Sequence, residues 1–346
     1  MVDASAGPTQ GLTALADLPL VGAGGEPVSL ARTLASHGVA SLPPNAIDEA
    51  AWTLTTTLAA GPRVHTVRLE GVGAGLARLW AVGPPPHAPA AAALVRQVRH
   101  MLRLDDDLSR FYARIMDDRL LSWAAIGAGR MMRSPSVFED VVKTICTTNC
   151  AWSATVRMVG ALVQGLGRDS GHGRAFPDAQ AMAEAPAGFY KDVARTGYRG
   201  AYLQALGREV TEGRLDLEAL QDPGLKDAEV ERRLLALPGV GPYAAAHVML
   251  TALGRSRSMI LDSWTRPTYA RLSGRAADDA AIRRRFRRYG DKAGLAFWLY
   301  LTRDWVADAA APARPARPLP QAEAAGPDRG AGVVRALDRG AGEAPA

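Results

Sequence analysis

The segment that is most informative about the fold is Leu237-Pro238-Gly239-Val240-Gly241-Pro242-Tyr243-Ala244-Ala245-Ala246. It joins two helical segments through a short turn with glycine at positions 239 and 241. Glycine adopts backbone angles that a side chain forbids, and it lets another group approach the main chain closely. The turn also opens a helix, whose free N–H groups and positive dipole end attract an anion. We expect Gly239, Val240 and Gly241 to hold a DNA phosphate, which positions a duplex without reading its sequence.

Asp262 follows the hairpin at the end of an apolar run, Met259-Ile260-Leu261. A carboxylate shielded by such a run is costly unless the site uses its charge. A fixed carboxylate stabilises the oxocarbenium character that develops on a sugar when an N-glycosidic bond breaks, and it can orient or deprotonate a water. Asp262 is therefore the candidate catalytic residue. The alternative, that Asp262 caps the helix starting at Ser263, is compatible with catalysis.

The hairpin followed by Asp262 resembles the helix-hairpin-helix (HhH-GPD) DNA glycosylase superfamily. Three further segments, Ser136–Cys150, Gly197–Tyr202 and Gly290–Trp305, are similar to the 3-methyladenine glycosylase II and 8-oxoguanine glycosylase branches. The resemblance covers residues 25–305 and implies an α+β, mainly α fold. In that fold a two-lobed helical domain is preceded by a small antiparallel β domain.

The chain divides into four segments. Residues 1–20 are expected to be disordered, and residues 306–346, rich in Ala, Pro, Gly and Arg, to form a disordered tail. Residues 21–102 include strand-like alternation between about 50 and 82 and predict a small antiparallel β domain that ends in a helix. Residues 103–305 are helical in pattern. Helices are predicted over 90–102, 105–117, 135–148, 151–166, 178–184, 187–195, 198–212, 227–236, 242–253, 263–272, 278–289 and 291–305.

The residue at position 243 bears on the mechanism. In the family that the chain resembles, bifunctional members carry a lysine there, which forms a Schiff base with the sugar. Here the position is Tyr243, which implies hydrolysis by water with lyase activity absent or weak. The only cysteines are Cys146 and Cys150, so the iron–sulfur cluster of some family members is not expected. We expect no cofactor and no metal, and leave open a structural monovalent cation at the hairpin.

Other residues are candidates for the DNA face. Asn149 lies where 8-oxoguanine glycosylases place an asparagine in the space that the flipped base vacates; a loop or capping role is the alternative. Tyr243, Trp264 and Phe297 are expected to stack on the base, with Trp298 as a further candidate. Arg199 is expected either to contact a phosphate or to pack the helical subdomains together. The 8-oxoguanine glycosylases also carry an arginine on the next helix, which reads the opposite cytosine. This chain has Ala154 at that position, which disfavours 8-oxoguanine opposite cytosine as the substrate.

Charge and hydropathy indicate the partner. The net charge is +6, and residues 255–303 hold twelve arginines and lysines but four aspartates, which favours a polyanion such as nucleic acid. No apolar run is long enough to span a membrane, and residues 1–11 do not resemble a signal peptide. We expect a cytoplasmic, nucleoid-associated monomer that binds double-stranded DNA containing a damaged base.

The alternatives concern substrate and class. An alkylated purine is the leading substrate, an 8-oxoguanine lesion is second, and a mismatched thymine or adenine is third. The alternative of another class is a non-catalytic DNA-binding module that uses the hairpin to hold phosphate. A separate alternative for the hairpin is a plain helix–turn–helix corner in which glycine is needed for steric reasons.

Overall fold

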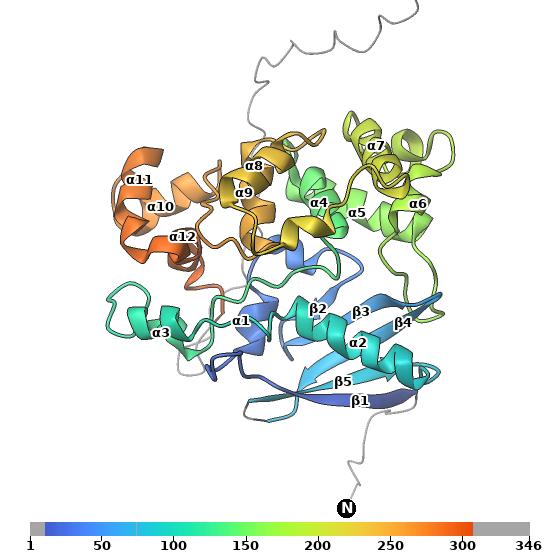
Figure 1. Ribbon diagram of the computed structural model, residues 1–346, viewed down its shortest axis with the longest axis horizontal. Helices are drawn as coiled ribbons and strands as arrows, with labels where there is room; N and C mark the ends of the chain where they lie inside the picture. The colour runs from blue at the N-terminus through green and yellow to red at the C-terminus, as the bar shows by residue number, and fades with distance from the viewer. Residues whose placement is uncertain (1–10, 74, 307–346) are drawn as a thin grey trace, which may run out of the picture.

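The computed structural model describes residues 11–73 and 75–306 of the chain. An antiparallel sheet lies at one end of the molecule, and two groups of helices lie beside it (Figure 1). The arrangement confirms the expected α+β, mainly α fold with a small β domain preceding a two-lobed helical domain. No helix among these residues is both long and apolar enough to cross a membrane.

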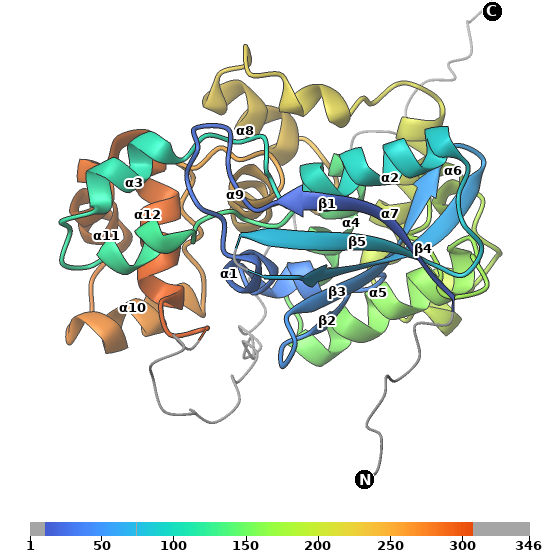
Figure 2. The same cartoon turned by 90° about the horizontal axis from the view of Figure 1, so that it is seen from below.

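The β domain is a five-stranded antiparallel sheet with strand order β1-β5-β4-β3-β2 (Figure 2). In β4 (Arg63–Gly71), Val67 and Leu69 are each 1% exposed and Arg68 and Glu70 are half-buried, because one face of the strand is turned to the core. The helix α2 (Ala88–Met101) packs over the sheet through Leu94, Val98 and Met101. The strands are β1 (Leu12–Pro19), β2 (Ala46–Asp48), β3 (Thr53–Ala60), β4 (Arg63–Gly71) and β5 (Leu76–Val82).

The prediction of disorder over residues 1–20 is wrong for the part that the structure describes. Residues 12–19 form β1, which pairs with β5 along its whole length. The pairing register shifts between Ala14 and Ala16, which marks a β-bulge. A bulge interrupts the two-residue alternation by which a strand is recognised in a sequence. Residues 1–10 and 307–346, where the other predicted disorder falls, lie outside the described residues.

The helices agree with most of the predicted ranges. The predicted helix over 187–195 is instead a single π-helical turn, Phe189–Val193, entered through Gly188 in the left-handed conformation. The predicted helix over 105–117 is shortened to α3. The helices are α1 (Leu30–Leu34), α2 (Ala88–Met101), α3 (Ser109–Ile115), α4 (Val137–Thr147), α5 (Trp152–Leu166), α6 (Ala179–Ala183), α7 (Arg199–Thr211), α8 (Asp227–Leu235), α9 (Pro242–Thr251), α10 (Thr265–Ser273), α11 (Asp279–Phe286) and α12 (Ala293–Thr302).

The helical domain has two lobes, each with its own core. The first lobe is built from α4 to α9, and the second from α3 and α10 to α12. Helix α9 lies between them (Figure 1), since Ala244 and Val248 belong to the first core and Leu250 to the second. The hairpin that leads into α9 therefore lies where the two lobes meet.

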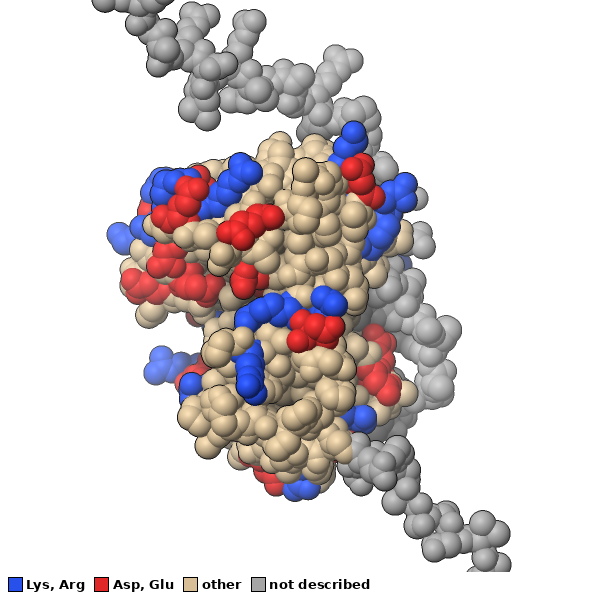
Figure 3. All heavy atoms as spheres, turned by 90° about the vertical axis from the view of Figure 1, so that its right-hand side faces the viewer, with Lys and Arg blue, Asp and Glu red and all other residues tan. Residues whose placement is uncertain are grey.

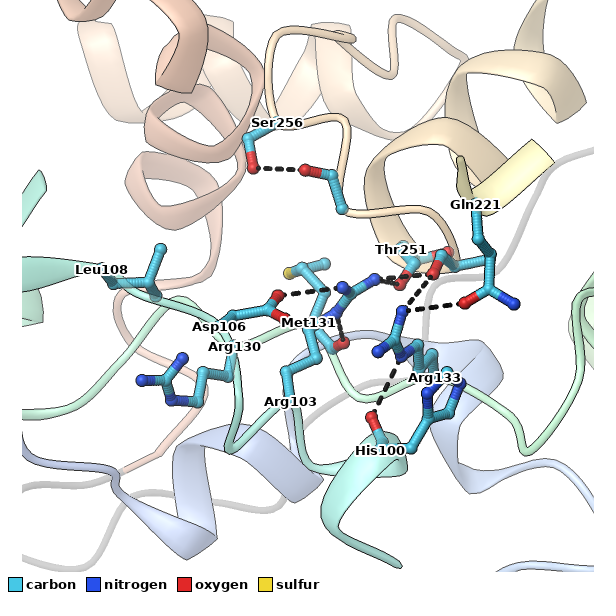
Figure 4. A network of polar contacts seen from close by, with 12 residues as sticks. His100, Arg103, Asp106, Leu108, Arg130, Met131, Arg133, Gln221, Thr251 and Ser256 are labelled. Atoms are coloured by element: carbon cyan, nitrogen blue, oxygen red, sulfur yellow. Dashed lines mark hydrogen bonds and ion pairs between the residues drawn. The ribbon is translucent and has the colours of Figure 1, made fainter. Parts of the chain in front are cut away.

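Two arginines fix the carboxyl end of α9 (Figure 4). Arg103 donates from Nη2 to the carbonyl oxygens of Thr251, at 2.6 Å, and Ala252, at 2.8 Å. Arg133 donates to the carbonyl of His100, at the end of α2. Burial, with Arg103 nearby, lowers the pKa of Arg133 to about 10. Cations at a helix carboxyl end are favoured by the helix dipole, so this cluster ties α9 to the β domain.

Candidate active site

A cavity of about 630 Å³ lies between the two helical lobes. Residues from both lobes and from the β domain line it. We call the first-lobe side the hairpin wall (Thr147–Cys150, Gly239, Gly241 and Tyr243) and the second-lobe side the tryptophan wall (Asp262, Trp264, Trp298 and Trp305). The β domain contributes Gly38 and Val39 at the edge.

The two hairpin glycines differ in backbone conformation and in the space around them. Gly239 has φ +83°, and a Cβ there would lie 2.8 Å from Cδ2 of Tyr202, so both the backbone and the packing require glycine. Gly241 is the N-cap of α9 with φ −95° and ψ −175°. A Cβ there would meet no heavy atom within 4 Å, so Gly241 leaves open space before the first N–H groups of α9.

The third residue of the predicted phosphate-binding turn is placed differently. Val240 is 6% exposed and packs in the core of the first lobe. Its side chain is therefore not available to a phosphate, and a contact from Val240 would have to come from its backbone.

Asp262 lies in the cavity and is held by the start of α10. Its Oδ1 accepts hydrogen bonds from the backbone N–H groups of Trp264, at 2.9 Å, and Thr265, at 2.7 Å. Its own N–H donates to Oγ1 of Thr265. The capping role is therefore present, and it fixes the carboxylate in place. Among the described residues that line the cavity, Asp262 is the one carboxylate.

Tyr243 lies across the cavity in the first turn of α9. Burial raises the pKa of its phenol to about 12, and the charge of Asp262 adds to this effect, so the phenol stays protonated. The hydroxyl lies 3.3 Å from Oγ1 of Thr147. No lysine is among the described residues that line the cavity. Lys143 is fully buried elsewhere, with Nζ 2.7 Å from Oε1 of Glu139.

Aromatic rings make up most of the tryptophan wall. The rings of Trp264, Trp298 and Trp305 lie 5.6 to 6.0 Å apart, centroid to centroid. Trp298 is fixed by a 2.7 Å hydrogen bond from Nε1 to the carbonyl of Ser36. The three rings form an apolar surface that can stack on a planar base.

The base-pocket role predicted for Phe297 is wrong. Phe297 is 0% exposed and packs against Tyr269 and Phe286 in the second core. The next residue, Trp298, faces the cavity instead. Adjacent side chains on a helix point in directions about 100° apart, and α12 is apolar all round, so its sequence does not indicate which side faces the cavity.

The DNA-contact role predicted for Arg199 is also wrong, and the alternative holds only in part, because Arg199 ties α7 to α4 within the first lobe and does not join the two lobes. Arg199 is 6% exposed. Its guanidinium donates to the carbonyl oxygens of Thr148 and Thr196 and lies over the ring of Tyr198, 4.6 Å from the centroid. Arg199 therefore caps the end of α4 and is not free for a phosphate.

Asn149 lies at the mouth of the cavity in the hairpin wall. It has φ +47°, in the left-handed region that asparagine tolerates better than most residues. Its Nδ2 lies 3.3 Å from the hydroxyl of Tyr198, which is 53% exposed. The residue is exposed, and its entry into a duplex stays a prediction.

Some lining residues were not found from the sequence. His247 is 5% exposed, and burial lowers its pKa to about 4, so its imidazole is neutral near pH 7. Its ring lies 5.9 Å from that of Tyr243 and 5.6 Å from that of His37. Trp305 also lines the cavity, as does Trp152, which follows the Asn149 loop and from the sequence is a candidate either for the base pocket or for the core. These residues come from three separate segments, and no local pattern joins them.

The basic excess of residues 255–303 is partly neutralised in the structure. Arg255, Arg266 and Arg288 form ion pairs with Asp227, Asp279 and Asp118. On the face that carries α5 to α7, basic and acidic side chains lie next to one another (Figure 3).

The residues that the structure describes contain no group of three or more His, Cys, Asp or Glu side chains that could hold a metal ion. Cys146 is fully buried on α4, and Cys150 is half-buried in the hairpin wall. A monovalent cation at the hairpin stays a prediction.

Comparison with known proteins identifies the fold. No protein-family model and no curated protein matches the sequence. Many solved structures are similar to this chain, including the following three. The 3-methyladenine DNA glycosylase from Archaeoglobus fulgidus has TM-score 0.65 and 19% identity over 84% of this chain and 98% of that one. A structure of MBOgg1 in complex with a low-affinity DNA ligand has TM-score 0.63 and 20% identity over 84% and 95%.

The third is the Clostridium acetobutylicum 8-oxoguanine glycosylase/lyase, with TM-score 0.58 and 19% identity over 77% of this chain and 93% of that one. The chain has the helix-hairpin-helix DNA glycosylase fold. The expected resemblance is thus confirmed at the level of the fold. Sequence identities of 19–20% show a shared fold and do not by themselves show a shared activity.

Proposed function

We propose that this chain is a DNA N-glycosylase that hydrolyses the N-glycosidic bond of a flipped, damaged base in double-stranded DNA. The observation that carries the proposal is Asp262, a single carboxylate fixed by two backbone N–H groups in a cavity of about 630 Å³. A cavity of this volume is in the range of small-molecule sites, and enzymes that act on a base must take it out of the duplex. The two similar folds that are named as glycosylases support the same activity.

In the proposed reaction, the bond between C1′ of the sugar and the base nitrogen breaks, and its electron pair leaves with the base. The carboxylate of Asp262 stabilises the positive charge that develops on the sugar. Water then adds to C1′ and releases a proton to Asp262 or to solvent. The product is a free base and an abasic sugar in an unbroken strand.

The cavity favours an alkylated purine as the substrate. A purine alkylated on a ring nitrogen is cationic, so it leaves as a neutral base and needs no proton from the enzyme. The lining supplies no ready acid, because His247 has its pKa lowered to about 4 by burial and Tyr243 has its pKa raised to about 12 by burial. The rings of the tryptophan wall also attract a cation through their π faces.

The mechanism is expected to be monofunctional. Strand cleavage by β-elimination needs an amine that forms an imine with the opened sugar, and a phenol such as Tyr243 cannot form one. Wild-type protein should therefore give no covalent adduct with DNA when borohydride is present. Tyr243→Lys should introduce a modest amount of adduct, since it places an amine in the cavity near Asp262. Efficient trapping of wild-type protein would contradict this part of the proposal.

The test of the activity is base release from a panel of duplexes that carry an alkylated purine, 8-oxoguanine or a mismatch. Released base and alkali-labile abasic sites should form with the alkylated purine, and Asp262→Asn should abolish both while DNA binding survives. Release of 8-oxoguanine alone would keep the glycosylase and replace the substrate. DNA binding without release of any base would favour the non-catalytic binding module.

A further inference from the structure

Arg266 lies between two carboxylates at the edge of the cavity. It is in the first turn of α10, four residues after Asp262, and it lines the cavity with that residue. Its Nε and Nη2 donate to Oδ1 and Oδ2 of Asp279, at 2.8 and 3.0 Å. Asp279 is in the first turn of α11. The guanidinium is thus held by the carboxylate outside the cavity.

The same guanidinium is also close enough to be influenced by Asp262. The pKa of Arg266 is raised, chiefly by the hydrogen bonds to Asp279, and the charge of Asp262 adds to the increase. Oδ1 of Asp262 already accepts two backbone hydrogen bonds. No hydrogen bond to Oδ2 is found among the described residues, so this oxygen could receive a guanidinium. A paired Asp262 would be less able to stabilise a cationic sugar, because its charge would be largely offset.

We propose that Asp279 is a positioning residue that holds Arg266 away from Asp262 and so keeps the carboxylate in the cavity unpaired and accessible. The inference rests on the proposed function of Asp262. It follows from the two-oxygen contact to Asp279, the four-residue separation of Arg266 from Asp262, and the presence of both side chains in one cavity lining.

Two single variants remove the same ion pair with different consequences. Asp279→Asn leaves the guanidinium of Arg266 free to turn to Asp262, whereas Arg266→Gln leaves nothing to turn. Arg266 and Asp279 are 45% and 44% exposed, and exposed pairs contribute little to stability, so both variants should fold. A purely structural tie would make the two variants alike.

The first readout is the pH profile of single-turnover base release. An arginine beside a carboxylate lowers the pKa of that carboxylate by about one unit or more. In Asp279→Asn the acid limb should therefore move to lower pH by about one unit, and the plateau rate should fall about tenfold as Asp262 becomes paired. In the double variant with Arg266→Gln, both effects should disappear. Rates should match those of Arg266→Gln alone.

The second readout does not depend on activity. Carboxyl carbon NMR titration of Asp262 in the DNA-free protein should give a lower pKa in Asp279→Asn than in wild type, and a much smaller change in the Arg266→Gln background. The proposal would be overturned if Asp279→Asn changed the pKa of Asp262 equally in wild type and in the Arg266→Gln background, because the effect would then come only from the lost charge of Asp279. It would also be overturned if the pKa of Asp262 changed in neither background. If the NMR titrations of the four proteins (wild type, the two single variants and the double variant) gave the expected pKa differences but the protein released no base, the proposed function would be refuted and the positioning role of Asp279 would stand.

Discussion

The hairpin wall and the tryptophan wall line one cavity but are built differently. The hairpin wall contains a short turn with two glycines before the start of α9, together with Thr147–Cys150 at the end of α4. The tryptophan wall presents side chains, and it is assembled from the start of α10, from α12 and from Trp305 beyond it. Backbone N–H groups at a helix start suit a phosphate that every nucleotide carries, whereas three rings and one carboxylate suit one base and one bond.

The largest expected effect on stability lies in the tryptophan wall. Trp298→Ala removes a buried ring and its hydrogen bond to Ser36, so it should lower the unfolding free energy by about 3–5 kcal/mol. Trp298→Phe keeps an aromatic ring and should cost about 1 kcal/mol. Urea unfolding of both variants measures this. Equal, small losses would mean that the wall is not a packed surface.

A somewhat smaller effect should come from His247, which touches the hairpin wall through Tyr243. Its folded pKa of about 4 lies below the ordinary value of 6.5, so the unfolded chain takes up a proton first as the pH falls. Stability from this residue is present above about pH 6.5 and is lost towards pH 4, on the order of 3 kcal/mol.

His247→Phe should remove that loss. Asp140 acts in the opposite direction, because burial raises its pKa to about 6 and its contribution to stability is lost as the pH rises from about 4 to 6. The prediction therefore concerns the difference between variant and wild type in urea unfolding at pH 7 and pH 4.5. A difference that does not change with pH would contradict it.

Substitutions at the two glycines of the hairpin wall should differ in their effect on stability. Gly239→Ala places a side chain at φ +83° and 2.8 Å from Tyr202, which should destabilise the fold by about 2–4 kcal/mol. Gly241→Asn should change stability by less than about 1 kcal/mol, because asparagine is a preferred N-cap and its Cβ meets open space. Thermal or urea unfolding of the two variants decides this. Equal losses would mean that Gly241 also serves packing.

The substitution Gly241→Asp should have the smallest effect in free energy, and it tests phosphate binding most specifically. Gly241→Asp has the size and capping ability of Gly241→Asn but adds a negative charge at the start of α9. It should weaken binding to undamaged duplex about tenfold more than Gly241→Asn at low salt, and the gap should narrow as salt rises. Fluorescence anisotropy titrations at two salt concentrations measure it. A gap that depends on DNA sequence would contradict phosphate binding.

The sequence predicts the hairpin wall better than the tryptophan wall, for a physical reason. In the hairpin wall, Gly239 and Gly241 follow from local rules for turns, and Tyr243 follows from the family resemblance; in the tryptophan wall, only Asp262 follows from a local rule, the apolar run before it, and all four residues line the cavity. Phe297 was preferred to Trp298 because α12 is buried on every side, so that its pattern has no polar face. Arg199 was assigned to DNA because the carbonyls that bind it, at Thr148 and Thr196, are brought to it only by the tertiary fold.

The same distinction applies to the fold. Most helices were predicted within a few residues because their caps and periodicity are local. Strand β1 was missed because its bulge breaks the alternation, and its pairing with β5 spans about sixty residues of sequence. Elements that owe their structure to distant partners are the ones that a sequence pattern leaves out.

The central claim is that one wall binds DNA and the other performs the chemistry, and a crossed comparison tests it most directly. Single-turnover base release and duplex affinity are measured for wild type, Asp262→Asn and Gly241→Asp on the same alkylated duplex. Asp262→Asn should lose at least about 10²-fold in rate with its Kd unchanged or tighter. Gly241→Asp should weaken binding and regain a near wild-type rate at saturating protein. Near wild-type release by Asp262→Asn would contradict the account.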